Sequence, residues 1–240
     1  TEVAGEVVPL AHAEGVSVQL CVTSFDDSVM SSVLPDPELR AITINEIVGL
    51  VDGYDADGVN IDFEGMNVDL KHDFTAFIQE LSLRVDELTL ALPAIDWNGA
   101  YDYDELAAAS DGLFIMGYGY HWTGGNPGPV APLYGGEPWS DYSLEWTVDD
   151  YLRWGATADK IILGLPLYGN EWPTISDAVP GTATGDGWSV IMSSADAIAD
   201  EEGSFWDETS LTSYILRDDT QLWYDDTDGV RYRIQWAVDQ

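Results

Sequence analysis

Short runs of apolar, often β-branched residues recur along the chain and alternate with longer stretches of helical periodicity. The apolar runs cover residues 16–23, 58–63, 88–92, 112–118 and 161–167. Their length and composition are typical of strands buried on both faces. Between the second and third runs, apolar residues recur three and four positions apart, at Phe74, Phe77, Ile78, Leu81 and Val85. This spacing predicts an amphipathic helix, and further helices are expected over residues 37–54, 104–109 and 148–154.

The alternation of strand and helix predicts an α/β fold in which parallel strands are joined by right-handed crossovers. Two architectures have this pattern, the (β/α) barrel and the doubly wound open sheet. No glycine-rich phosphate-binding turn follows the first strand, which favours the barrel. Residues 170–230 lack helical periodicity and are rich in Trp, Gly, Asp and Thr, which predicts a loop-rich region or a small β insert. Within it, Asp228 and Gly229 lie between two apolar segments and predict a hairpin turn.

The second strand carries an unusual row of polar residues. On a strand, alternate side chains face opposite sides, so its apolar residues face one way while Asn60, Asp62 and Glu64 face the other. Burying two neighbouring carboxyl groups is costly unless they share a proton or have good partners. Such pairs have pKa values that are pushed apart, and the carboxyl ends of barrel strands are where catalytic groups gather. The row therefore predicts a catalytic site.

Two other interpretations of the same residues are open. The acids could form a solvated strand end, which an acidic composition favours anywhere. They could also form a calcium loop, because Asp55, Asp57, Gly58 and Glu64 match an EF-hand. However, the first ligand position of that loop falls on Gly53, and the residues after Gly58 have the pattern of a strand. We therefore favour catalysis.

Charge and cysteine content exclude several classes of function. The chain has 44 acidic residues and eight lysines and arginines, a formal net charge of −36, so neither nucleic acid nor an anionic membrane surface is an expected partner. No segment approaches the ~20 apolar residues of a membrane span. Cys21 is the only cysteine and is expected to be a small buried residue, without a disulfide or a multi-cysteine metal site. Three scattered histidines indicate no metal, and no cofactor is expected.

Several motifs, taken together, resemble glycoside hydrolase family 18. Asp57, Gly58, Asp62 and Glu64 match its D-G-x-D-x-D-x-E signature, with Asn60 where chitinases usually carry Asp. Residues 116–118 resemble the Met-x-Tyr at the end of the family's sixth strand, residues 163–169 its seventh strand, and residues 222–226 the segment before the eighth. Residues 60–65 and 119–122 are most similar to the spore-germination and cortex-lytic branch, which acts on peptidoglycan rather than chitin.

The resemblance implies a TIM-type (β/α) barrel. The first recognisable strand is similar to the family's third, so family strands three to seven are expected here. Residues 1–240 then form a single barrel domain, a fragment without the first two strands and the last. Besides Asn60, Gly119 departs from the family, which commonly has Asp or Asn there.

The resemblance also implies a reaction, the retaining, substrate-assisted hydrolysis of β-1,4 bonds in chitin or peptidoglycan. In that reaction Glu64 is the acid and base, Asp62 holds the acetamide N–H, and Tyr118 orients the acetamide carbonyl. The polysaccharide is then the partner, and a secreted or cell-envelope location is expected. The alternative is a catalytically inactive glycan-binding module on the same fold, because Asn60 and Gly119 depart from the family pattern.

Further substrate contacts are expected at the ends of the strands. The candidates are Asn60, Asp57, Asp96, Trp97, His121, Trp122, Tyr168 and Trp172. Tryptophan and tyrosine rings suit contact with sugar faces. For Tyr168 and Trp172, packing within the protein is an equal alternative.

The net charge generates a first prediction, about salt. If the acidic surface is an adaptation to high salt, screening of the repulsion among 44 acids should raise the melting temperature between low-salt buffer and molar potassium chloride. Differential scanning calorimetry measures this directly. A melting temperature that is flat or falls with salt would instead identify an ordinary acidic extracellular protein.

Overall fold

The computed structural model describes residues 2–240, which form two compact units. The first unit comprises the chain up to Ile115 together with Tyr151–Ile162. The second comprises Met116–Asp150 and Leu163–Gln240. Helix α6 (Leu144–Arg153) runs across the boundary in the chain.

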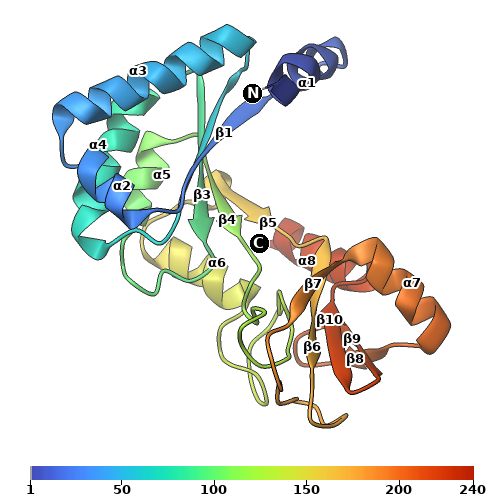
Figure 1. Ribbon diagram of the computed structural model, residues 1–240. Coiled ribbons are helices and arrows are strands. Elements are labelled where there is room, and N and C mark those ends of the chain that lie inside the picture. The colour runs from blue at the N-terminus through green and yellow to red at the C-terminus, as the bar shows by residue number, and fades with distance from the viewer. Residues whose placement is uncertain (1) are drawn as a thin grey trace. The chain divides into compact units, whose positions relative to one another are not determined.

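The first unit is built on a five-stranded sheet whose order, β1-β2-β3-β4-β5, is the order of the sequence (Figure 1). The β1–β2 and β2–β3 pairs are parallel. A doubly wound sheet would reverse its order at a switch point, so the prediction of a barrel-type α/β fold is confirmed. Among the described residues the sheet stays open, with β1 and β5 at its edges. The strands are β1 (Gln19–Ser24), β2 (Gly58–Phe63), β3 (Glu87–Pro93), β4 (Gly112–Met116) and β5 (Ile161–Gly164).

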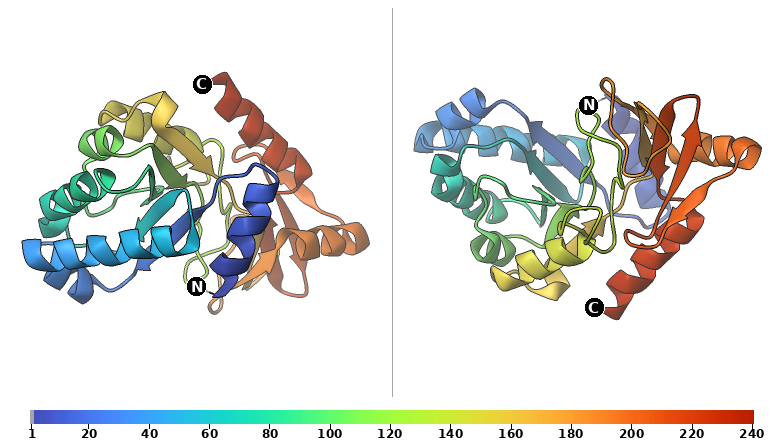
Figure 2. Two further views of the ribbon diagram at one scale, coloured as in Figure 1. Left: turned by 90° about the horizontal axis from the view of Figure 1, so that it is seen from above. Right: turned by 90° about the horizontal axis from the view of Figure 1, so that it is seen from below.

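Helices form an outer layer over one face of this sheet (Figure 2). They are α2 (Asp27–Val33), α3 (Pro37–Tyr54), α4 (Lys71–Ser82) and α5 (Tyr103–Ala109). Helix α1 (Glu2–Ala13) precedes β1 in the chain, and short 3-10 helices cover Val68–Leu70 and Ala158–Lys160. Asp36 caps the start of α3, because its carboxylate accepts the N–H groups of Glu38 and Leu39, which have no partner within the helix. Among the described residues, no helix is both long and apolar enough to span a membrane.

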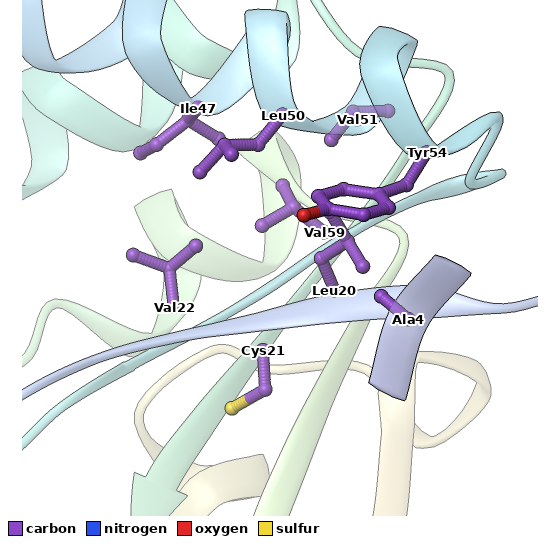
Figure 3. Close-up of a pocket in the computed structure, with 9 residues that line it drawn as sticks. All are labelled: Ala4, Leu20, Cys21, Val22, Ile47, Leu50, Val51, Tyr54 and Val59. Atoms are coloured by element: carbon purple, nitrogen blue, oxygen red, sulfur yellow. The ribbon is translucent and has the colours of Figure 1, made fainter. Parts of the chain in front are cut away.

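The core of the first unit lies between the helices and one face of β2. Val59 and Ile61 are fully buried there, and the Phe63 ring stacks on Phe77 of α4 at a centroid distance of 5.6 Å. On the edge strand β1, Leu20 and Val22 follow the same alternation. With α3 and the start of α1 they line an apolar cavity of about 250 Å³, and the Cys21 side chain lies on the other side of the strand (Figure 3). The two-residue period thus divides both strands into an apolar and a polar face.

The second unit contains an antiparallel sheet of order β7-β6-β10-β9-β8. Its strands are β6 (Tyr168–Pro173), β7 (Trp188–Ile191), β8 (Phe205–Asp207), β9 (Thr212–Arg217) and β10 (Thr220–Tyr224), and its helices are α7 (Met192–Glu202) and α8 (Thr227–Asp239). The prediction of a small β insert between residues 170 and 230 is therefore confirmed.

The hairpin predicted at Asp228 and Gly229 is wrong. Those residues lie in the first turn of α8, because Asp226 caps the helix and its carboxylate accepts the N–H of Gly229 at 2.8 Å. The real hairpin joins β9 to β10 through Asp218 and Asp219, which both adopt positive φ angles. A capping aspartate two residues before Asp-Gly, Asp226, therefore favoured a helix start over a turn.

A buried ion pair holds α8 in the second unit. The side chains of Arg233 and Asp225 are 0% and 2% exposed, and Nη2 of Arg233 lies 2.8 Å from Oδ1 of Asp225. The guanidinium also donates to the carbonyl oxygens of Ala131, Leu211 and Gly229. One side chain thus connects α8 with two segments that are distant in sequence.

The second prediction compares two arginines of α8. Arg233→Met leaves Asp225 buried without its cation and should lower the free energy of unfolding by about 3–5 kcal/mol. Arg231→Met removes only an exposed pair with Asp228, which is worth about 0–1 kcal/mol. Urea unfolding of both variants measures the difference. Equal losses would show that Arg233 does not anchor α8.

Candidate active site

Asp62 and Glu64 lie on the polar face and at the carboxyl end of β2. Glu64 is the first residue after the strand, and its N–H donates to the carbonyl oxygen of Ser24 on β1 at 2.9 Å. The apolar residues of β2 are buried, and Asn60 and Asp62 are only half-buried, so the predicted alternation is confirmed. The side chains of Asp62 and Glu64 are hydrogen-bonded to each other.

The two carboxyl groups are not equivalent. Burial raises the pKa of Glu64, and the charge of Asp62 and their mutual hydrogen bond raise it further. Burial also raises the pKa of Asp62, but there the hydrogen bond from Glu64 acts in the opposite direction. These directions favour the protonated form of Glu64 as the donor to Asp62. The Oδ1 atom of Asp62 is buried and has no hydrogen-bond partner among the described residues, so it can accept from a bound molecule.

A polar network crosses the first three strands beneath this pair. Asn60 donates from Nδ2 to Oγ1 of Thr89 at 2.8 Å, and the Thr89 hydroxyl donates to Gln19 at 2.5 Å. Cys21 lies beside Asn60, with Sγ 3.7 Å from Oδ1. The expectation that Cys21 is a buried residue is wrong, because its position in the alternation places it on the polar face, where it is exposed. Partial burial and the charge of Asp62 raise the pKa of its thiol, which favours the protonated form.

A small cavity opens beside Glu64. It has a volume of about 150 Å³ and is lined by Glu64 and by the loop after β3, including Asp96, Trp97 and Tyr101. Asp96 shapes this loop by accepting the N–H of Tyr101 at 3.0 Å, and the Trp97 side chain is 70% exposed. The structure therefore brings Asp96 and Trp97 to Glu64, as the sequence predicted. Tyr101 was not predicted, because a tyrosine in a loop has no periodic signal.

Asp57 lies at the other end of β2 and does not line this site. Its Oδ2 atom accepts the N–H of Val18 at 2.6 Å and lies 2.9 Å from Nε2 of His12, and these partners lower the pKa of Asp57. Its assignment as a substrate contact is corrected to a structural role at the start of the strand.

The calcium-loop alternative is also wrong, because Asp55 ends α3 and Gly58 begins β2, which leaves no ligand loop. Among the described residues, no cluster of three or more His, Cys, Asp or Glu side chains could hold a metal ion.

The remaining candidates belong to the second unit. Tyr118 follows β4, and its ring packs edge-to-face against Tyr168 at the start of β6, with centroids 6.0 Å apart. His121 packs edge-to-face on Trp139 at 5.5 Å, and burial lowers the pKa of His121, which favours the neutral ring. Trp122 is 64% exposed. Substrate contacts by Tyr118, Tyr168, His121 and Trp122 stay predictions.

Trp172 is not a surface residue. Its side chain is fully buried in a cluster with Val130, Trp139 and Trp223, so no substrate can reach it. Of the two alternatives for Trp172, packing is correct. It lies on a central strand of an antiparallel sheet, where the inward face forms the core.

Comparison with known proteins agrees with this geometry. The family model for glycosyl hydrolases family 18 matches residues 16–240. YdhD of Bacillus subtilis, described as a sporulation-specific glycosylase, is 34% identical over 185 residues, which cover 73% of this chain and 40% of that protein. The chain thus spans less than half the length of this relative.

Solved structures show the same fold. The ydhD structure has a TM-score of 0.86 at 23% identity, covering 98% of this chain and 80% of that chain. A chitinase from Trichuris suis has a TM-score of 0.91 at 19% identity, covering 98% and 73%. The chain therefore has the barrel-type fold of these proteins.

The third prediction concerns position 60. Asn60→Asp places a second negative charge beside Asp62, and like charges raise a carboxyl pKa, so the pKa of Asp62 should rise further and the two titrations should become coupled. Carbon-13 NMR of the carboxyl groups measures both. Asp57→Asn, at the far end of the same strand, is the control and should leave Asp62 unchanged. An unchanged Asp62 titration in Asn60→Asp would refute the placement of these side chains on one face.

Proposed function

The chain belongs to glycoside hydrolase family 18, and we propose that it hydrolyses β-1,4 glycosidic bonds in N-acetylated amino-sugar glycans, chitin or peptidoglycan, with retention of configuration. One observation carries the proposal. Asp62 and Glu64 share a hydrogen bond at the carboxyl end of β2. Burial, the charge of Asp62 and this hydrogen bond all raise the pKa of Glu64, whereas the hydrogen bond lowers the pKa of Asp62. A carboxyl group that keeps its proton beside an acceptor is suited to proton transfer.

The geometry supports a substrate-assisted reaction, in which the 2-acetamido carbonyl oxygen of the sugar attacks the anomeric carbon. Glu64 protonates the departing glycosidic oxygen as the bond breaks. The resulting carboxylate then takes a proton from the water that opens the cyclic intermediate. Asp62 accepts the acetamide N–H through its unsatisfied Oδ1 atom and stabilises the positive charge that develops on the acetamide.

Other residues of the proposal bind the glycan. Trp97 presents an exposed indole at the cavity beside Glu64, where it can stack on a sugar face. Tyr118 orients the acetamide carbonyl, as the family motif implies. Because chitin and peptidoglycan lie outside the cytoplasm, we also propose a secreted or cell-envelope location, with which the strongly acidic composition agrees.

The fourth prediction tests Glu64. Glu64→Gln retains the shape of the side chain but cannot donate a proton, so hydrolysis should fall by about 10²–10⁴-fold while glycan binding is retained. Burial disfavours the ionised form of Glu64, so its charge costs stability at pH values above the ordinary pKa, and the variant should melt no lower than the parent at neutral pH. Glu46→Gln, at an exposed position of α3, controls for the lost charge.

Initial rates on labelled chitooligosaccharide and on purified peptidoglycan identify the substrate, and the anomer first released, followed by NMR, shows whether configuration is retained. Glu64→Gln with parental activity would exclude Glu64 as the acid. A parent chain that binds both glycans and cleaves neither would establish the glycan-binding alternative.

A further inference from the structure

Tyr101 lines the cavity beside Glu64 and contacts the residues around the acid pair. It lies in the loop between β3 and α5, and its side chain is 6% exposed. Its ring packs edge-to-face on Phe74 of α4 at 5.9 Å. Its hydroxyl donates to the carbonyl oxygen of Phe63 at 2.7 Å, and its N–H donates to Asp96 at 3.0 Å. The residue thus connects the end of β2 with the loop that walls the cavity.

The carbonyl bound by Tyr101 belongs to the peptide group that carries Glu64. The N–H of this peptide donates to Ser24 on β1, so it is held on one side by the sheet. On the other side, the pairing of β2 with β3 ends at Ile61 and Leu90. Beyond that point β3 provides no partner for the Phe63 carbonyl, and the Tyr101 hydroxyl takes that place. Both polar groups of the peptide are therefore fixed, which fixes the direction in which the Glu64 side chain leaves the backbone.

We propose that Tyr101 is the positioning residue of Glu64, since it locks the Phe63–Glu64 peptide from the β3 side and holds the Asp96 loop against the same carboxyl group. The inference rests on the proposed function, in which Glu64 transfers the proton. Reacting groups must be held within fractions of an ångström, and a misplacement of about 1 Å can cost about 100-fold in rate.

The hydroxyl acts as a permanent donor. Burial raises the pKa of Tyr101, and the charges of Asp96, Glu64 and Asp62 raise it further, so the group stays protonated at any working pH. Within this unit, the titratable side chains that interact with Glu64 or Tyr101 are Asp62 on β2, Asp96 in the loop after β3, and Tyr151, whose hydroxyl binds the last residue of β3. Tyr101 therefore affects Glu64 through geometry and exclusion of water rather than through its own titration.

The chain provides a matched control in Tyr151. Its hydroxyl donates at 2.7 Å to the carbonyl oxygen of Pro93, the last residue of β3, as Tyr101 does for the last residue of β2. Both tyrosines are buried. No candidate acid follows Pro93 directly, since residue 94 is alanine. Tyr101→Phe and Tyr151→Phe thus remove the same kind of bond, but only the first removes it from the peptide of Glu64.

The fifth prediction compares these two variants. Both should lower the melting temperature by similar amounts. Tyr101→Phe should also lower kcat between about 10- and 100-fold with KM within twofold of the parent. It should shift the pKa of Glu64 downward, measured by carbon-13 NMR, because a loosened wall admits water and relieves the burial that raises this pKa. Tyr151→Phe frees the carbonyl of Pro93, which also lines the cavity, but leaves the Glu64 peptide bonded, so it should change kcat and the pKa of Glu64 much less than Tyr101→Phe does.

Each outcome decides one question. Parental kcat and an unchanged Glu64 titration in Tyr101→Phe would overturn the inference, as would changes of kcat and of the Glu64 pKa that are equal in the two variants. The titration does not require turnover, so a parent chain without hydrolase activity would refute the proposed function and still leave the positioning role measurable. Circular dichroism of both variants at the assay temperature verifies that they are folded.

Discussion

The alternation of side chains on β2 is the constraint on which the site depends. Val59 and Ile61 are fully buried under the helices, and they fix which way the strand faces. Because successive side chains point to opposite faces, this burial forces Asn60 and Asp62 onto the other face of the sheet. A shift of one residue would bury the acids and expose the core. Hydrophobic burial on one side thus supplies the free energy that holds two neighbouring carboxyl groups on the other.

The acid pair differs from the rest of this acidic chain in its surroundings. Most of the 44 acids cannot pair with eight lysines and arginines and must stay in contact with water. Glu64 and Asp62 are instead partly desolvated by the strands and by the loop after β3, and this raises their pKa values. Salt screens the distant charges of the acidic surface far more than it screens a contact between partly buried neighbours. Local burial, rather than the net charge, therefore shifts the pKa values of these two acids.

The sequence predicted the strands of the parallel sheet and the two faces of β2 well because a short-range pattern determines both, whereas on β1 the face of Cys21 was predicted wrongly. The bounds of β2 and the placement of Asp62 and Glu64 follow from alternation alone. Features set by tertiary contacts could not be predicted in this way. Tyr101 binds a carbonyl 38 residues away, and Trp172 is buried because an insert without clear periodicity folds into an antiparallel sheet. At Asp228 and Gly229 a turn signal and a helix cap competed locally, and the cap at Asp226 prevailed.

The family signature contains residues with two different roles along β2, one structural at the start of the strand and one chemical at its end. Its first acid, Asp57, binds the N–H of Val18, the residue before β1, and so aligns the starts of β1 and β2. That register continues to the other end, where Ser24 of β1 accepts the N–H of Glu64. Asp57 therefore contributes to the pairing of two strands at the end of β2 that is far from the acid pair, and it does not line the site. A match to a catalytic motif then identifies the residues that build a site, while burial and hydrogen-bond partners indicate which of them are suited to the chemistry.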